Sequence, residues 1–169
     1  MIAVCPITRL SESAEAYRAD RLLSLLSAGS KVARPARIAP ADHLTLYFHD
    51  IAEPLHGYVT PSAAHVAAAL GFAAADGRPI LVHCFAGVSR STAMAFAIAC
   101  AREPERDERE LAGTLRRLSP TATPNPLIVR LADEALGRGG RMVEAVAAIG
   151  RGRDAFEGVP FALEPGAPG

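Results

Sequence analysis

Residues 79–91, which read Pro-Ile-Leu-Val-His-Cys-Phe-Ala-Gly-Val-Ser-Arg-Ser, decide the fold of this chain. The stretch opens with a short apolar run of the length expected for a buried strand. Small and turn-forming residues follow Cys84, and a long apolar helical pattern begins at Arg90. The order predicts a strand, a tight loop and a helix, with a cysteine where the strand ends and an arginine where the helix starts.

A loop of this kind has the properties of an anion-binding site. A chain that curls between a strand end and a helix start turns its backbone N–H groups inward, and the helix dipole adds positive potential. Gly87 supplies the backbone freedom that a tight curl requires. Arg90 can donate two parallel hydrogen bonds to phosphate oxygens. The same field favours the thiolate form of Cys84, which could attack a bound phosphorus atom.

These residues carry a resemblance to a known family. His83, Cys84, Gly87, Arg90 and Ser91 fit the His-Cys-x5-Arg-Ser signature of the protein tyrosine phosphatase superfamily, and the chain is similar to its dual-specificity branch. By the order of its motifs the resemblance covers roughly residues 44–136. It implies hydrolysis of phosphotyrosine, with phosphoserine and phosphothreonine as further candidates, through a cysteinyl-phosphate on Cys84. The implied phosphate-binding residues are Phe85, Ala86, Gly87, Val88, Ser89 and Arg90.

The resemblance also places a general acid on a loop about thirty residues before the cysteine. Asp50 meets that requirement, because it follows a predicted strand and opens a loop rich in turn residues. Glu53 is the alternative acid, and Asp50 could instead be a carboxylate that only caps its loop. Ser91 is expected to donate a hydrogen bond to the Cys84 thiolate.

Two supporting residues have two interpretations each. His83 either orders the loop through its ring or is a packed core histidine. Asn125 lies in Pro124-Asn125-Pro126, which resembles a proline-asparagine segment of dual-specificity phosphatases. It would then brace the active-site loops, but it could equally be the N-cap of the following helix.

The rest of the chain alternates strands with helices, which predicts an α/β fold with a central, mainly parallel sheet of four to five strands flanked by helices. Strands are expected at 2–7, 43–48 and 79–83, and helices at 12–26, 62–75, 90–102, 104–118, 127–136 and 142–149. Because ligands bind beyond the carboxyl ends of parallel strands, Asp50 and Cys84 should lie near one another. Residues 1–150 would form a single cysteine-phosphatase domain, and residues 151–169 a loosely ordered tail.

Composition sets further bounds. The formal net charge of zero gives no support for binding to nucleic acid or to an anionic membrane. Three cysteines are too few for a disulfide framework, and the start of the chain lacks a signal-peptide pattern, so we expect a cytoplasmic protein. The chemistry needs no cofactor and no metal, and no zinc-like ligand spacing is present. The sequence does not indicate an oligomeric state.

The expected partner is a phosphorylated protein or a small phosphomonoester. The absence of lysine from the loop disfavours phosphoinositide head groups. Aryl phosphates need an aromatic wall beside the loop, for which Tyr47, Phe48, His56 and Tyr58 are the candidates.

Two other classes of function remain open. One is a phosphate-binding module without turnover. The other is a sulfur-transfer or arsenate-reducing enzyme, which would need a resolving cysteine. Cys5 and Cys100 are the remaining cysteines, and both fall in predicted core elements.

Overall fold

Five strands form one sheet in the order β3-β2-β4-β1-β5 in the computed structural model, which describes residues 1–164. The strands are β1 (Ile2–Pro6), β2 (Arg21–Leu26), β3 (His43–Tyr47), β4 (Ile80–Cys84) and β5 (Phe161–Leu163). The first four are parallel, and β5 runs antiparallel to β1 at the edge. The predicted α/β class with a mainly parallel sheet is confirmed.

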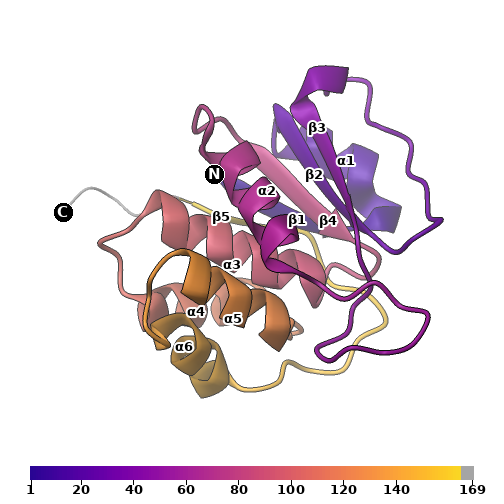
Figure 1. Ribbon diagram of the computed structural model, residues 1–169. Coiled ribbons are helices and arrows are strands. Elements are labelled where there is room, and N and C mark those ends of the chain that lie inside the picture. The colour runs from indigo at the N-terminus through magenta and orange to yellow at the C-terminus, as the bar shows by residue number, and fades with distance from the viewer. Residues whose placement is uncertain (165–169) are drawn as a thin grey trace.

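Helices cover both faces of the sheet (Figure 1). The short helix α1 (Leu10–Ala16) packs on the face formed by Ala3, Cys5, Leu22 and Leu81. The larger layer packs on the opposite face, which Val4, Leu23, Leu25 and Val82 form. Alternate residues of a strand point to opposite faces, so these two sets follow directly from the pleat. The larger layer consists of α2 (Ala63–Ala74), α3 (Arg90–Arg102), α4 (Glu108–Leu118), α5 (Pro126–Ala135) and α6 (Arg141–Ile149). Two 3-10 turns span Ile7–Arg9 and Pro40–Asp42.

The strand β4 lies in the middle of the sheet and the helix α3 lies in the middle of the helical layer. Every residue of β4 is buried, and so is every residue of α3 from Arg90 to Cys100. A strand and a helix that are buried on all sides must be apolar almost throughout, which is why 79–99 stands out in the sequence. The segment that joins them, residues 85–89, is therefore held at both ends by the core.

The predicted helix at 12–26 is wrong in its second half. The helix α1 ends at Ala16, Arg18 takes a positive φ of 47°, and residues 21–26 form β2, the neighbour of β4. All six residues of β2 are buried, because the strand is covered on both faces. A short, continuous apolar run fits a buried strand and a buried helix equally well, so periodicity alone did not separate them.

The expectation of a loosely ordered tail from residue 151 also needs correction. Phe161–Leu163 pairs with Ile2–Val4 as the edge strand β5, with Phe161 and Leu163 buried. Residues 165–169 lie outside the described part of the chain. No helix within residues 1–164 is long and apolar enough to cross a membrane.

Candidate active site

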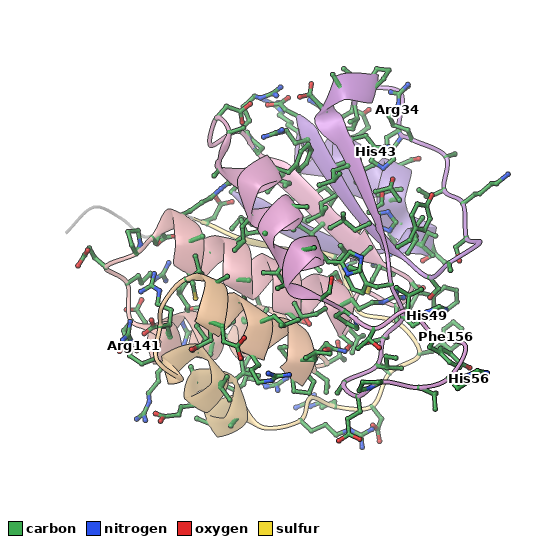
Figure 2. The ribbon with its side chains drawn as sticks, viewed as in Figure 1. Arg34, His43, His49, His56, Arg141 and Phe156 are labelled. Atoms are coloured by element: carbon green, nitrogen blue, oxygen red, sulfur yellow. The ribbon has the colours of Figure 1, made fainter. Side chains whose placement is uncertain are left out.

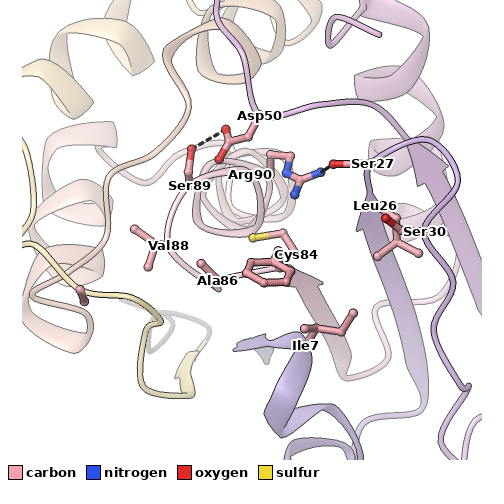
Figure 3. A pocket seen from close by; sticks show the side chains of 12 residues that line it. Ile7, Leu26, Ser27, Ser30, Asp50, Cys84, Ala86, Val88, Ser89 and Arg90 are labelled. Carbon is pink, nitrogen blue, oxygen red and sulfur yellow. Dashed lines mark hydrogen bonds between the residues drawn. The ribbon is translucent and has the colours of Figure 1, made fainter. Parts of the chain in front are cut away.

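Cys84 ends β4 at the floor of a cleft of about 450 Å³ at the carboxyl ends of the parallel strands (Figure 3). Its side chain is almost completely buried, with 2% of the residue exposed. The residues that line the cleft are Ile7, Leu26, Ser27, Ser30, Asp50, Cys84, Phe85, Ala86, Val88, Ser89, Arg90 and Ala155. The structure thus brings Asp50 and Cys84 to one cleft, as the positions of their strands predicted.

The loop from Phe85 to Ser89 turns its carbonyl groups outward. Four of them accept hydrogen bonds from backbone N–H groups elsewhere in the chain: Phe85 from Ile7 (3.1 Å), Ala86 from Gly158 (2.8 Å), Val88 from Thr123 (2.9 Å) and Ser89 from Asn125 (3.3 Å). Within residues 1–164, none of the backbone N–H groups of residues 85–90 donates a hydrogen bond to the protein. Since the carbonyls accept hydrogen bonds on the outside, the amides of residues 85–90 are left free to bind an anion, as the predicted phosphate-binding role requires.

Gly87 lies where this loop passes close to the end of β1. Its φ is +69°, in the region that disfavours side chains. A Cβ atom here would also lie 2.7 Å from the backbone N of Pro6 and 2.8 Å from the carbonyl carbon of Cys5. Glycine is therefore required at this position both by the curl of the loop and by the end of β1.

Arg90 is a buried cation without a carboxylate partner. It is the first residue of α3 and only 5% exposed. Its Nη1 donates to the carbonyl of Phe48 (2.8 Å) and to Ser27 Oγ (3.4 Å), while its buried Nε has no partner among residues 1–164. The same residues include no acidic side chain within 4.0 Å of its guanidinium. Figure 3 shows this guanidinium on the same side of the loop as Cys84 Sγ.

Ser91, one residue further along α3, is fully buried beside the cysteine. Its Oγ lies 3.2 Å from Cys84 Sγ. Its hydroxyl proton can therefore be donated to a thiolate at this sulfur, the arrangement expected from the sequence.

His83 has both of the features proposed for it. It is a fully buried core residue, and burial lowers its pKa to about 4, so the ring is neutral. Its Nδ1 lies 3.4 Å from the carbonyl oxygen of Cys84, which can only accept, so Nδ1 is the protonated nitrogen. Its Nε2 then accepts from Ser24 Oγ at 2.7 Å.

Ser24 was missed in the sequence analysis. It is the one polar residue in the run Leu22–Leu26, and its Oγ also lies 2.8 Å from His43 Nε2. Because the Ser24 hydroxyl proton is donated to His83, Ser24 accepts from His43. The signal was available, since a single serine in a fully buried strand needs a polar partner. A helix at residues 21–26 would not place Ser24 beside His83, whereas the strand β2 does.

Asp50 is held at the rim of the cleft through one of its two oxygens. Its Oδ1 accepts from Ser89 Oγ at 2.7 Å and from Asn125 Nδ2 at 2.9 Å. No hydrogen bond to Oδ2 is present within residues 1–164, so this oxygen is open to carry a proton. Glu53, the alternative acid, is exposed and does not line the cleft.

Asn125 combines its two proposed roles. Its Oδ1 accepts from the backbone N–H groups of Leu127 and Ile128, which makes it the N-cap of α5. Its Nδ2 donates to Asp50 and, at 3.3 Å, to the carbonyl of Ile51. One amide side chain therefore joins the loop at Asp50 and Ile51 to the start of α5.

The aromatic residues expected to form a wall do not do so. Phe48 is completely buried in the core. Tyr47, His56 and Tyr58 are exposed, but none of them lines the cleft. The aromatic side chain that does line it is Phe85, which is 60% exposed.

The other two cysteines lie in the core. Cys5 and Cys100 are each 1% exposed, and burial raises the pKa of each thiol to about 12. Residues 1–164 contain no group of three or more histidine, cysteine or acidic side chains that could hold a metal ion.

Comparison with known proteins identifies the fold. No family model and no curated protein matches the sequence. Solved structures do match: DUSP15 has a TM-score of 0.64 at 18% identity, covering 88% of this chain and 89% of that one. The human tyrosine phosphatase-like serine/threonine/tyrosine-interacting protein has a TM-score of 0.63 at 17% identity, covering 82% and 92%. The PTP-2 phosphatase of Cydia pomonella has a TM-score of 0.60 at 20% identity, covering 79% and 84%. The predicted resemblance to dual-specificity phosphatases is therefore confirmed for the fold.

Proposed function

We propose that this protein is a cysteine-dependent phosphatase that hydrolyses phosphotyrosine and related phosphate monoesters through a cysteinyl-phosphate intermediate. One observation carries the proposal. A buried guanidinium with an open Nε stands beside a buried cysteine, inside a ring of backbone amides that have no protein acceptor. Buried donors without acceptors are costly, and a phosphate dianion would satisfy all of them at once.

In the first half of the reaction, the Cys84 thiolate attacks phosphorus and the bond from phosphorus to the leaving oxygen breaks. Arg90 and the loop amides hold the three equatorial oxygens as charge moves through the transition state. Asp50, protonated on Oδ2, donates its proton to the leaving oxygen. The two donors on Oδ1 keep the other oxygen of this carboxyl group oriented toward the cleft.

In the second half, the Asp50 carboxylate takes a proton from a water molecule, and that water attacks the phosphorus of the cysteinyl-phosphate. The bond between sulfur and phosphorus breaks, inorganic phosphate leaves, and the thiolate returns. Ser91, 3.2 Å from the sulfur, donates a hydrogen bond that stabilises the departing thiolate. The second step is needed because the first leaves the phosphoryl group on Cys84, and the covalent route divides one extremely slow hydrolysis into two easier steps.

The decisive experiment measures aryl phosphate hydrolysis under reducing conditions. We expect turnover by the wild type and none by Cys84→Ser. Acid quenching during turnover, followed by mass spectrometry, should find phosphate on the Cys84 peptide. The matched control is Cys100→Ala, which removes a buried thiol from the far end of α3 and should leave the intermediate detectable.

The same assay separates the other two functions. A wild type that binds inorganic phosphate but has no turnover would be a binding module; one solved structure of this fold is named phosphatase-like. Turnover of thiosulfate or arsenate in place of aryl phosphate would indicate sulfur transfer or arsenate reduction. The positions of Cys5 and Cys100 favour the phosphatase, since neither lines the cleft in which a resolving cysteine would have to meet Cys84.

A further inference from the structure

The segment that follows α6, residues 151–160, is attached to residues 85–89, the proposed phosphate loop. The backbone N–H of Gly158 donates to the carbonyl of Ala86 at 2.8 Å. A Cβ atom on Gly158 would lie 3.0 Å from the carbonyl oxygen of Gly87, so the two backbones are in direct contact. The end of the segment continues into β5, which pairs with β1.

The beginning of the segment is attached as well. The N–H of Gly152 donates to Thr123 Oγ1 at 3.1 Å, and the N–H of Thr123 donates to the carbonyl of Val88. The N–H of Arg153 donates to the carbonyl of Pro120 at 2.9 Å. Residues 154–157 thus lie between two points of attachment to the loop of residues 85–89. Gly152 is joined to Val88 through Thr123, and Gly158 is joined to Ala86.

Two exposed phenylalanines meet where this segment passes the cleft. Ala155 lines the cleft, and the neighbouring Phe156 is 83% exposed. The Phe156 ring lies edge-to-face with the Phe85 ring, with 6.4 Å between centroids and 78° between planes. Figure 2 shows Phe156 on the same side of the molecule as His49, the residue before Asp50. Two exposed aromatic side chains in contact with each other beside the cleft offer a surface that an apolar group can cover.

We infer that Phe85 and Phe156 form an aromatic wall that receives the aryl ring of the substrate, so that residues 152–158 complete the active site. This inference rests on the proposed phosphatase function. With the phosphoryl group in the loop beside Cys84, the ester group of the substrate must leave the loop through the cleft that Phe85 lines. An aryl ring there can pack against an exposed phenylalanine, whereas the short alkyl stem of phosphoserine offers little surface.

The test compares ligand binding in a Cys84→Ser background, where no turnover occurs. Calorimetry would measure the affinities of inorganic phosphate and phenyl phosphate with and without Phe156→Ala. We expect the variant to weaken phenyl phosphate roughly three- to tenfold, the range that one aromatic contact supplies, and to leave inorganic phosphate unchanged. Val159→Ala is the matched control, because Val159 is 77% exposed on the same segment but lines a different hollow with Arg9 and Tyr17.

Each outcome has a distinct meaning. Equal phenyl phosphate affinity in Phe156→Ala and its parent would contradict the proposal that Phe156 contacts the aryl ring. A loss shared by inorganic phosphate would also overturn it, because Phe156 would then act only by supporting the loop. Failure of the Cys84→Ser parent to bind inorganic phosphate would instead remove the proposed function. Repeating the comparison with a phosphotyrosine peptide separates a protein substrate from a small aryl phosphate, since additional peptide contacts would raise the parent's affinity above that for phenyl phosphate.

Discussion

Two buried arginines at opposite ends of the sheet have opposite surroundings. Arg21 begins β2 and is 6% exposed. Its guanidinium lies 3.6 Å from Asp76 and 3.9 Å from Asp42, packs over the Phe72 ring and donates to the Phe72 carbonyl. Arg90, at the carboxyl ends of the strands, is equally buried and has only neutral acceptors within residues 1–164.

The difference lies in how the positive charge is paired at each end of the sheet. Hydrogen bonds from Arg78 hold the pKa values of Asp42 and Asp76 below their usual range, so both remain ionised and offset the charges of Arg21 and Arg78 at their end. At the other end, no carboxylate within residues 1–164 lies within 4.0 Å of the Arg90 guanidinium. A buried charge without a partner opposes folding, so this arrangement supports the proposed binding of an anion there.

The largest expected effect comes from replacing each of the two arginines, Arg21 and Arg90, with lysine and measuring kcat/KM and stability. Arg90→Lys keeps the charge but loses the planar fork, and we expect kcat/KM for an aryl phosphate to fall by about 10²–10³-fold. Arg21→Lys should lower the urea midpoint of unfolding and leave kcat/KM of the folded enzyme unchanged. Similar kinetics for Arg90→Lys and the wild type would remove Arg90 from the phosphate site.

Asp50 shares the end of the sheet with Arg90 but pairs with neutral donors instead. Asp50→Asn should lower kcat about 10²-fold for an alkyl phosphate, whose leaving group needs a proton. For p-nitrophenyl phosphate, whose leaving group departs as an anion, we expect a loss of less than about tenfold. Glu53→Gln is the control and should behave as the wild type. Equal losses for the two substrates would argue against Asp50 as the acid, and a larger loss in Glu53→Gln would transfer the role to Glu53.

His83 adds a third buried basic side chain to the comparison of Arg21 with Arg90. A buried histidine can become neutral, whereas a buried arginine stays charged. Burial lowers its pKa to about 4, against about 6.5 in the unfolded chain. Between these values the unfolded chain binds a proton that the folded protein does not, so stability falls as the pH falls. The contribution of His83 amounts to about 2 kcal/mol lost between pH 7.5 and pH 5.

Urea unfolding of the wild type and His83→Gln at those two pH values measures this term. The variant should lose about 2 kcal/mol less on acidification, whatever its stability at pH 7.5. Burial also lowers the pKa of His65, whose contribution cancels in the comparison because His65 contacts neither Ser24 nor His83. His43 is joined to His83 through Ser24, so the measured difference belongs to His83 together with His43. Identical losses in the two proteins would mean that His83 titrates normally in the folded state.

Substitutions at Asn125 have the smallest expected effect. Two variants distinguish its role as the N-cap of α5 from its hydrogen bond to Asp50. Asn125→Ala removes the N-cap of α5 and should cost about 1 kcal/mol of unfolding free energy. Asn125→Asp keeps an acceptor for the helix N–H groups but replaces the donor to Asp50 with a like charge. We expect Asn125→Asp to be more stable than Asn125→Ala yet less active than the wild type. Full activity in both variants would leave Asn125 as a helix cap only.

Some features could be predicted because their physics is local. The strand before Cys84 and the helix from Arg90 to Arg102 have a composition that only a buried position explains. The loop between them is too short to separate Cys84 from Arg90. Asp50 could be placed near them because parallel strands deliver their carboxyl ends to one edge. The strand β2 was mistaken for a helix because burial on both faces removes the alternation that identifies a strand.

The sequence by itself determined where Cys84, Arg90 and the loop between them lie, because seven consecutive residues and a helix start impose their own geometry. Only the tertiary structure decided which groups stay open. The contacts of Asn125 with Asp50, of Gly158 with Ala86 and of Ser24 with His83 join residues 75, 72 and 59 positions apart. Packing of distant segments, which no local pattern encodes, directs the loop carbonyls outward and leaves Arg90 Nε without an acceptor among residues 1–164.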